Sequence, residues 1–374
     1  MKKVLIFTPR VSGQRAHYYN SLAKLCDLTV LSELDTPMDT LFDYNVVRKD
    51  FQHVVMDGIK FRINSYEALC LNYKKYFKNK IYDCIIIEQV FTPTAFLIMR
   101  YLKRNHITFL ASADGGIVNH NENIIKFLIK KSFISLPDFW LTSGKGGQTY
   151  LNSYGIKNDK IFKFIFSPYC EGDLPVCMID NIEKNYLRSK LGIREKIVIF
   201  TAGQPIYRKG HDILLNVISK LDCDVGVYFA GGGPNSICRK ILSSLNKKTS
   251  SNIHFVGLLD KEKLKEYYSV SDIFVFPSRY DIWGYPIQEA MAFGLPIISS
   301  NASNSAIELI VNGENGYLFE NENVTDLKQK LKLLLKDDNL REKIRINNFK
   351  KSKLYTSENM AKSIYEIITE MENI

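Results

Sequence analysis

Residues 276–294 read FPSRYDIWGYPIQEAMAFG, a sequence that predicts a strand, a polar loop and a short helix. An apolar run ends at Phe276, and the expected helix begins near Pro286 and stops at Gly294. Proline early in a helix and glycine just past its end are usual helix boundaries. The first-turn N–H groups of a helix lack intrahelical acceptors. Helped by Gly284, they are suited to bind a phosphate.

Glu289 lies about one turn into this expected helix. Helical side chains lean toward the N-terminus, so its carboxylate would reach toward a ligand bound at that end. A carboxylate repels phosphate but accepts hydrogen bonds from sugar hydroxyls, which makes a nucleotide ribose the expected partner. The alternative is that Glu289 only caps the helix or forms a surface salt bridge.

The same order of strand, loop and helix recurs along the 374-residue chain, whose length suits two domains. Strands are expected at residues 4–8, 28–31, 84–88, 107–111, 140–142, 197–202, 225–230, 253–256, 273–276 and 296–299. Helices are expected at residues 14–25, 93–104, 123–133, 145–154, 212–221, 261–269 and 286–293, and after residue 319. Apolar strands separated by helices predict parallel sheets covered on both faces. The fold class is therefore α/β, with two tandem doubly wound domains joined at a turn-rich segment near residues 166–175.

A second informative stretch, residues 200–211, reads FTAGQPIYRKGH. Arg208 and Lys209 stand side by side where an expected strand gives way to a helix. Two cations and the free N–H groups of a helix end together suit a diphosphate. An Arg-Lys pair alone is more often a solvated surface feature, and that alternative stays open here.

Charge is unevenly distributed along the chain. Residues 1–170 hold 23 Lys and Arg against 14 Asp and Glu, while the whole chain carries a net charge of +10. This asymmetry indicates an anionic partner such as a lipid surface, although ordinary solvated lysines would give the same count. The candidate basic residues are Lys74, Lys75, Lys78, Lys80, Lys126, Lys130 and Lys131.

No apolar run approaches the roughly 20 residues of a membrane-spanning helix. The seven cysteines form no CxxC pair and no zinc-ligand spacing with histidine. We therefore expect a cytoplasmic protein with reduced thiols, with the inner face of the membrane as its candidate peripheral location.

The segment 276–294 resembles the E-x7-E signature of the retaining GT-B glycosyltransferases of family four (glycosyl transferases group 1). That family includes phosphatidylinositol mannosyltransferase-like and sucrose synthase-like enzymes. Asp281 stands at the first acidic position and Glu289 at the second, with Trp283 and Gly284 where Phe-Gly is commoner. The resemblance implies that Glu289 binds the nucleotide ribose and that Asp281 approaches the hydroxyls of the donor sugar. It also places Trp283, Gly284 and Tyr285 beside the nucleotide.

Other positions are assigned through the same resemblance. Family members commonly read G-R-x4-K-G where this chain has Gly203, Gln204 and Lys209, so Arg208 is inferred to replace the missing guanidinium. The remaining implied positions are Gly257 and Leu258 beside the base, Gly13 in the first loop, and Asp114 and His120 near the donor sugar.

The resemblance implies a GT-B architecture. Residues 1–168 would form the acceptor-binding domain and residues 175–356 the nucleotide-sugar-binding domain, with a C-terminal helix at about 357–374 packing back on the first. It further implies a hexosyltransferase that takes sugar from a nucleotide diphosphate, expected to be UDP. The acceptor would be a glycan or a lipid-linked saccharide of capsule or lipopolysaccharide synthesis. No cofactor and no metal are expected, because Arg208, Lys209 and helix amides would stabilise the departing diphosphate.

Two rival interpretations remain at this level. A nucleotide-sugar epimerase can share the two-domain architecture, but it needs more acids and histidines than the sequence offers near the expected site. A nucleic-acid-binding protein would suit the basic half, yet no recognised module is present and the aromatic residues follow core periods.

Overall fold

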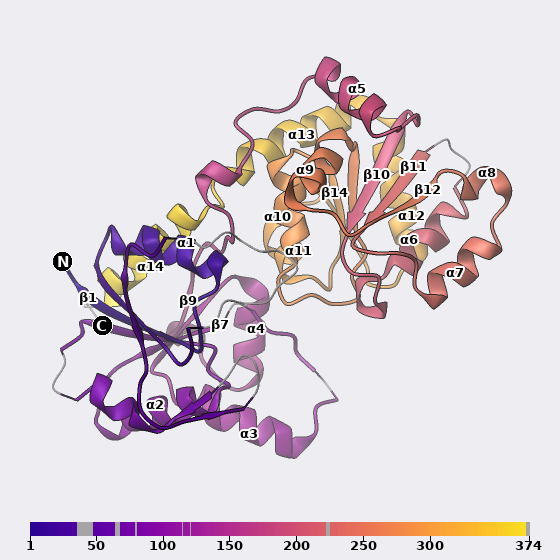
Figure 1. Cartoon of the computed structure of the whole chain (residues 1–374). Helices are drawn as coiled ribbons and strands as arrows, with labels where there is room; N and C mark the ends of the chain where they lie inside the picture. The colour runs from indigo at the N-terminus through magenta and orange to yellow at the C-terminus, as the bar shows by residue number, and fades with distance from the viewer. Residues whose placement is uncertain are drawn as a thin grey trace. The chain divides into compact units, whose positions relative to one another are not determined.

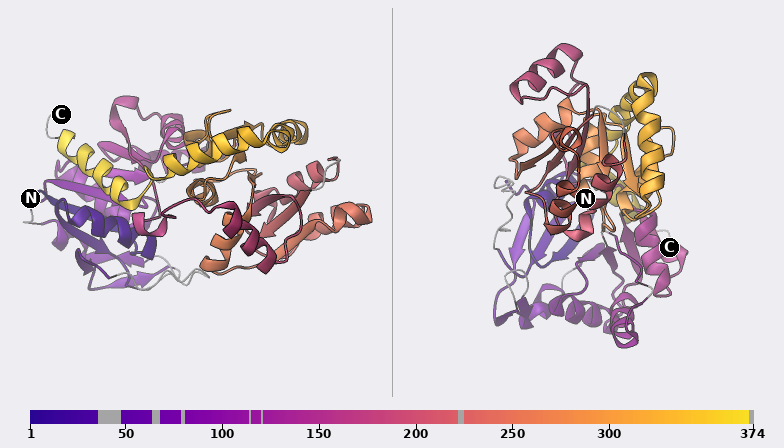
Figure 2. Two further views of the ribbon diagram at one scale, coloured as in Figure 1. Left: turned by 90° about the horizontal axis from the view of Figure 1, so that it is seen from above. Right: turned by 90° about the vertical axis from the view of Figure 1, so that its right-hand side faces the viewer.

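The structure is a computed structural model that describes residues 1–35, 48–63, 68–78, 81–113, 115–119, 121–221 and 225–371. The chain forms two compact units. One comprises Met1–Asp173 and Tyr355–Ile374, and the other comprises Leu174–Leu354. The chain therefore passes from one unit to the other twice, within a few residues of the boundaries expected from the sequence. Figures 1 and 2 show strands flanked by helices in each unit.

The first unit contains a parallel sheet with the strand order β3-β2-β1-β6-β7-β8-β9. Its strands are β1 (Lys3–Thr8), β2 (Asp27–Ser32), β3 (Gln52–Val55), β6 (Cys84–Glu88), β7 (Leu110–Ala113), β8 (Phe139–Thr142) and β9 (Ile161–Lys163). A separate antiparallel pair joins β4 (Lys60–Arg62) to β5 (Ala68–Cys70). The helices are α1 (Gly13–Ala23), α2 (Pro93–Arg104), α3 (Ile124–Ile134), α4 (Lys145–Ser153) and α14 (Ser357–Glu370), with 3-10 turns η1 (Leu71–Tyr76), η2 (Asn158–Lys160) and η3 (Glu171–Asp173).

The C-terminal helix α14 packs against α1 in this first unit (Figure 1). Lys2 Nζ donates to the carbonyl oxygen of Ile368 at 3.3 Å, and Ser363 Oγ accepts a hydrogen bond from the Ile165 N–H at 3.2 Å. Ile364 and Ile368 are buried. The packing of this helix on the N-terminal domain, expected from the resemblance, is confirmed.

The second unit contains a parallel sheet with the order β12-β11-β10-β13-β14-β15. Its strands are β10 (Ile197–Ala202), β11 (Val225–Ala230), β12 (Ile253–Gly257), β13 (Ile273–Phe276), β14 (Ile297–Ser300) and β15 (Gly316–Phe319). Its helices are α5 (Asn181–Lys190), η4 (Tyr207–Lys209), α6 (His211–Ile218), α7 (Ser236–Ser243), α8 (Lys247–Ser250), α9 (Lys261–Val270), α10 (Tyr285–Ala292), α11 (Asn304–Leu309), α12 (Val324–Lys336) and α13 (Asp338–Ser352). Figure 1 shows α9 and α10 on one side of the strands and α6 and α12 on the other. The α/β class with two parallel-sheet, Rossmann-like domains is therefore confirmed.

Some elements differ from the sequence predictions. The strand expected at residues 107–111 is β7 (Leu110–Ala113), because Ile107 packs on the core in the segment that precedes the hydrogen-bonded strand. The strands β3, β9 and β15 and the β4–β5 pair were not predicted. β3 and β9 are the two edge strands of the first sheet, and the exposed or half-buried side chains of β3 give no continuous apolar run.

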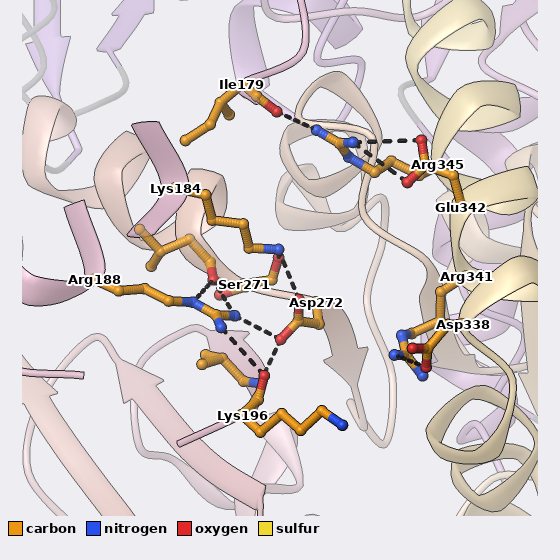
Figure 3. Close-up of polar contacts among 12 residues, drawn as sticks. Ile179, Lys184, Arg188, Lys196, Ser271, Asp272, Asp338, Arg341, Glu342 and Arg345 are labelled. Atoms are coloured by element: carbon orange, nitrogen blue, oxygen red, sulfur yellow. Dashed lines mark hydrogen bonds and ion pairs between the residues drawn. The ribbon is translucent and has the colours of Figure 1, made fainter. Parts of the chain in front are cut away.

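Half-buried ion pairs hold the start of the second unit in place (Figure 3). Asp272 accepts hydrogen bonds from Lys184 Nζ at 2.7 Å and from Arg188 Nη2 at 2.6 Å, both on α5. Burial alone would raise the pKa of Asp272, but the two cations outweigh it and hold that pKa below its ordinary value. Arg345 of α13 donates to the carbonyl oxygen of Ile179 just before α5. This cluster fixes α5 against the sheet and has a structural role.

Among the described residues, no helix has both the length and the apolar composition needed to cross a membrane.

Candidate active site

Three charged side chains of the second unit converge beyond the carboxyl ends of β10 and β13. Asp281 Oδ2 accepts a hydrogen bond from Lys209 Nζ at 2.5 Å and another from Arg208 Nη1 at 3.0 Å. Arg208 and Lys209 belong to η4, which follows β10, and Asp281 lies in the loop after β13. These strands are neighbours in a parallel sheet, so their carboxyl ends share the edge at which ligands bind. The structure thus brings together three of the predicted site residues.

The cluster is largely shielded from solvent. The exposed fraction of the side chain is 12% for Lys209, 13% for Asp281 and 31% for Arg208. Burial lowers the pKa of Lys209, with Arg208 adding to the decrease and Asp281 opposing it. Lys209 Nζ also lies 5.0 Å from the centre of the Phe276 ring. Two cations and one anion leave a single net positive charge, which is suited to a phosphate group.

A second ion-pair group, which the sequence analysis missed, holds the two loops together. Arg279 donates to the two carboxylate oxygens of Asp212 at 2.9 and 2.7 Å and to Glu322 at 2.6 Å. The Asp212 carboxylate raises the pKa of Arg279. The Arg279 guanidinium lies 3.7 Å from the centre of the Tyr207 ring. The backbone N–H of Arg279 donates to the carbonyl oxygen of Arg208 at 2.8 Å. The loop that carries Asp281 is thereby fixed against the one that carries the cations.

His211, the first residue of α6, is a buried neighbour of the cluster. Burial lowers the pKa of His211 to about 4, and the charge of Lys209 adds to the decrease. Its ring packs against Phe229 with the ring centres 5.3 Å apart. His211 is therefore neutral at pH 7 and adds no charge to the site.

The helix α10 begins where the sequence predicted a phosphate-binding end. Its N-cap is Gly284, with φ of 99° and ψ of 65°, a left-handed conformation that glycine adopts without steric cost. A Cβ at this position would lie 2.8 Å from Ser303 Oγ and 3.1 Å from both Phe276 Cε1 and Ser305 Oγ. Both the backbone angle and the close packing therefore require glycine.

Replacing Gly284 by alanine is expected to lower the free energy of unfolding of the second unit by about 2 kcal/mol, because a non-glycine residue there is strained. Urea unfolding followed by tryptophan fluorescence measures this, since Trp140 lies in the first unit and Trp283 in the second. Gly233→Ala is the matched control, because a Cβ at Gly233 would meet no atom within 4 Å. Equal free energies of unfolding for Gly284→Ala and Gly233→Ala would contradict the requirement for glycine at position 284.

Glu289 lies one turn into α10 and accepts a hydrogen bond from the Tyr268 hydroxyl at 2.6 Å. Tyr268 is buried in α9, and burial together with the Glu289 charge raises its pKa well above the ordinary value. The phenol therefore stays protonated and orients the Glu289 carboxylate. This contact makes Glu289 part of a fixed arrangement and excludes a purely solvated surface role.

Trp283 and Tyr285, the other residues predicted to lie beside the nucleotide near α10, are buried and half-buried respectively. Trp283 is only 5% exposed, and its indole Nε1 donates to Gln288 Oε1 at 2.9 Å. Its side chain thus packs beside α10 and supports the loop. Tyr285, the first residue of α10, is half-buried. Nucleotide contact by Trp283 and Tyr285 stays a prediction.

Glycines at the carboxyl ends of β10, β11 and β12 shape the rest of this edge. Gly203 has φ of 152°, and a Cβ there would lie 3.4 Å from Lys209 Cδ, so the Lys209 side chain runs across it. A Cβ at Gly231 would lie 2.2 Å from the carbonyl oxygen of Gly203. Gly257, with φ of 78°, accepts a hydrogen bond from the Gly231 N–H at 2.8 Å, and Leu258 beside it is 61% exposed. Leu258 is thus accessible to a ligand, and its contact with a base stays a prediction.

The first unit holds the remaining predicted residues. Gly13 is the first residue of α1, directly after the N-cap Ser12, whose side chain accepts a hydrogen bond from the Arg15 N–H at 3.3 Å. Asp114 and His120 lie outside the described residues, so their predicted contacts with the donor sugar remain predictions.

A buried acid that the sequence analysis missed lies at the carboxyl end of β6. Glu88 is 3% exposed and accepts hydrogen bonds from the hydroxyls of Tyr18 and Tyr19, each at 2.6 Å. It also pairs with Arg15, so all three partners come from α1. The available signal was an acid that ends an otherwise apolar strand, CIIIE. The cluster fixes α1 at the carboxyl edge of the first sheet.

Comparison with known proteins identifies the second unit. Residues 183–351 match the family model described as glycosyl transferases group 1. The second unit therefore carries a domain of the kind described as glycosyl transferases group 1. The matched residues include the whole cluster of Arg208, Lys209 and Asp281, together with α10 and Glu289.

Two relatives of the chain and one solved structure illustrate the extent of the similarity. An uncharacterized glycosyltransferase of Methanocaldococcus jannaschii is 24% identical over 83% of this chain and 92% of its own length. The N-acetylgalactosamine-N,N'-diacetylbacillosaminyl-diphospho-undecaprenol 4-alpha-N-acetylgalactosaminyltransferase of Campylobacter jejuni is 24% identical over 73% of this chain and 72% of its own. The crystal structure of HepE of Anabaena in complex with UDP and glucose matches 99% of this chain and 100% of its own, at a TM-score of 0.69 and 15% identity.

Several other curated relatives match over a shorter region, and the chain spans only 30% to 44% of their length. The full-length structural match gives the chain a GT-B fold, as the resemblance implied.

Proposed function

We propose that this glycosyltransferase transfers a hexose, with retention of configuration, from a UDP-sugar to a lipid-linked saccharide in cell-surface polysaccharide synthesis. The observation that carries the proposal is the cluster in which Asp281 holds Arg208 and Lys209 at 3.0 and 2.5 Å beside the N-terminus of α10. Such a cluster provides the positive charge that a diphosphate requires, at the strand edge where nucleotides bind in this fold class.

Each part of the donor has a candidate partner in the second unit. Arg208, Lys209 and the first-turn N–H groups of α10 would bind the diphosphate. Glu289, oriented by Tyr268, would accept hydrogen bonds from the ribose hydroxyls. Asp281 would accept a hydrogen bond from a hydroxyl of the sugar once its cations turn to the phosphates. UDP is the proposed nucleotide, and support comes from HepE, which has the same fold and was crystallised with UDP and glucose.

The reaction breaks the bond between the anomeric carbon and the diphosphate oxygen, and negative charge develops on that oxygen. Arg208 and Lys209 are placed to stabilise this charge, the kind of electrostatic term that is usually the largest in catalysis. The acceptor oxygen would attack from the same face, and its proton would pass to the departing phosphate. Asp114 and His120 remain candidates for contacts with the sugar, and we propose that no metal is needed.

The proposed acceptor is supported by the name of one relative and by the positive charge of residues 1–170. The Campylobacter jejuni relative bears the name of an enzyme that acts on a diphospho-undecaprenol-linked saccharide. Residues 1–170 carry the excess of lysine and arginine noted above. An anionic membrane surface at the cytoplasmic side would bring such an acceptor to the enzyme.

A donor screen tests this function directly. The full chain is mixed with a panel of nucleotide sugars, and binding is measured by the increase in melting temperature. The preferred donor is then incubated alone, with a diphospho-undecaprenol-linked saccharide, and with the same acceptor plus a metal chelator. We expect a UDP-sugar to stabilise the protein and transfer to be retained with the chelator. Isomerisation of the donor without acceptor would instead identify an epimerase, and stabilisation by no nucleotide sugar would refute the proposal.

A further inference from the structure

The helix α3 exposes a continuous apolar surface. Ile124, Ile125, Leu128 and Ile129 are 65%, 64%, 56% and 54% exposed. Their spacing places them on one side of the helix, because residues four apart are neighbours on a helix surface. Ile134 belongs to the hydrophobic core of the first unit, and Phe127 packs against that core. Figure 1 shows α3 at the outside of this unit. The exposed side of α3 is therefore distinct from the side that holds it to the protein.

Lysines flank this apolar surface. At the helical period, Lys126 falls at one border of the exposed side and Lys131 at the other, and both are exposed. Lys130 is turned back toward the protein, where it pairs with Glu122. The sequence of α3, IIKFLIKKSFI, contains no acidic residue. Apolar side chains bordered by lysines are the pattern of helices that lie in a membrane interface.

We propose that α3 docks on an anionic lipid bilayer. Ile124, Ile125, Leu128 and Ile129 would enter the boundary between headgroups and acyl chains, with Lys126 and Lys131 at the lipid phosphates. This proposal rests on the proposed function, because docking would bring the enzyme to a lipid-linked acceptor. Of the basic residues that the sequence indicated as a lipid-binding surface, the proposal retains those of a single helix, α3.

Charge favours a bilayer over a second copy of the chain as the occupant of this surface. Two copies facing each other through α3 would bring Lys126 and Lys131 of both into one interface, whereas anionic headgroups neutralise them. The basic residues expected in and after η1 are weaker candidates. Lys75 pairs with Asp57, and Lys80 lies outside the described residues.

Vesicle co-sedimentation of the full chain tests this assignment. Vesicles of phosphatidylcholine alone are compared with vesicles containing about 30% phosphatidylglycerol, a composition that gives an anionic surface. The double variant Leu128→Ser/Ile129→Ser is expected to bind the anionic vesicles at least about tenfold more weakly than the unchanged chain, because apolar burial drives insertion. Lys126→Gln/Lys131→Gln is expected to remove the preference for anionic vesicles.

Two controls separate docking from folding and from catalysis. Ile182→Ser changes an isoleucine that is 83% exposed on α5 in the second unit and should leave vesicle binding unchanged. All variants should keep the melting temperature and the donor-induced stabilisation of the unchanged chain, so that a loss of vesicle binding is distinguishable from failure of the proposed function. The proposal is overturned if Leu128→Ser/Ile129→Ser binds vesicles normally. It is equally overturned if sedimentation velocity shows that α3 instead forms a dimer interface.

Discussion

Replacing Lys209 by alanine is expected to lower the kcat of glycosyl transfer by about 10²- to 10³-fold, the cost of removing one preorganised group that stabilises developing negative charge. Lys209 is placed for this role because it is the more buried of the two cations, and its charge is poorly replaced by water. Initial rates with saturating acceptor measure the loss, and nucleotide affinity is measured separately by calorimetry.

The matched control for this prediction is Lys220→Ala, an exposed lysine of the same unit, which should transfer at the normal rate. Glu289→Ala should behave differently from Lys209→Ala, with weaker donor binding as its main effect, since Glu289 is proposed to contact the ribose and not the leaving group. Full transfer activity in both Lys209→Ala and Glu289→Ala would contradict the assignment of these residues to the donor site.

Replacing Asp281 by asparagine is expected to have opposite effects on binding and on transfer. Asp281 neutralises Arg208 and Lys209 in the ligand-free protein, so a diphosphate must compete with it for the same cations. Its removal should tighten the binding of UDP alone on the order of tenfold, equivalent to about 1.4 kcal/mol. Transfer should fall by about 10²-fold, because a donor-sugar contact made in the transition state is lost.

Calorimetric titration with UDP and with the intact donor, at low and high salt, distinguishes the two effects. The gain in UDP affinity should shrink as salt screens the cations. Glu262→Gln, at an exposed carboxylate of α9, is the control for a change in net charge. If Asp281→Asn binds UDP more weakly than the unchanged chain, Asp281 does not compete with the diphosphate.

The sequence was sufficient for the central strands of both sheets, for reasons visible in their burial. β6, β10 and β13 are almost entirely apolar and buried and are followed by polar loops, and their observed bounds equal those expected. Edge strands such as β3 carry exposed or half-buried side chains, so their pattern does not stand out from a loop. The hairpin of β4 and β5 is too short to show any period.

The sequence indicated Arg208, Lys209 and Asp281 as candidate site residues, but not the contacts among them. Arg208 and Asp281 are 73 positions apart, and only the adjacency of β10 and β13 brings their side chains into contact. The same holds for Arg279 with Asp212 and for Glu88 with the tyrosines of α1. An ion pair that depends on which strands are neighbours leaves no pattern in the local sequence. The charged residues could therefore be recognised as candidates, but their ion-pair partners could not.

The position of α14 has a consequence for synthesis on the ribosome. Chains emerge from their N-terminus and their domains generally fold as units. The second unit, Leu174–Leu354, is complete before α14 has been made, whereas the first unit begins earlier and is finished later. Until residues 357–370 emerge, α1 lacks the helix that covers it. Residues 174–354 therefore emerge before α14, the helix that covers α1 in the domain that was started first.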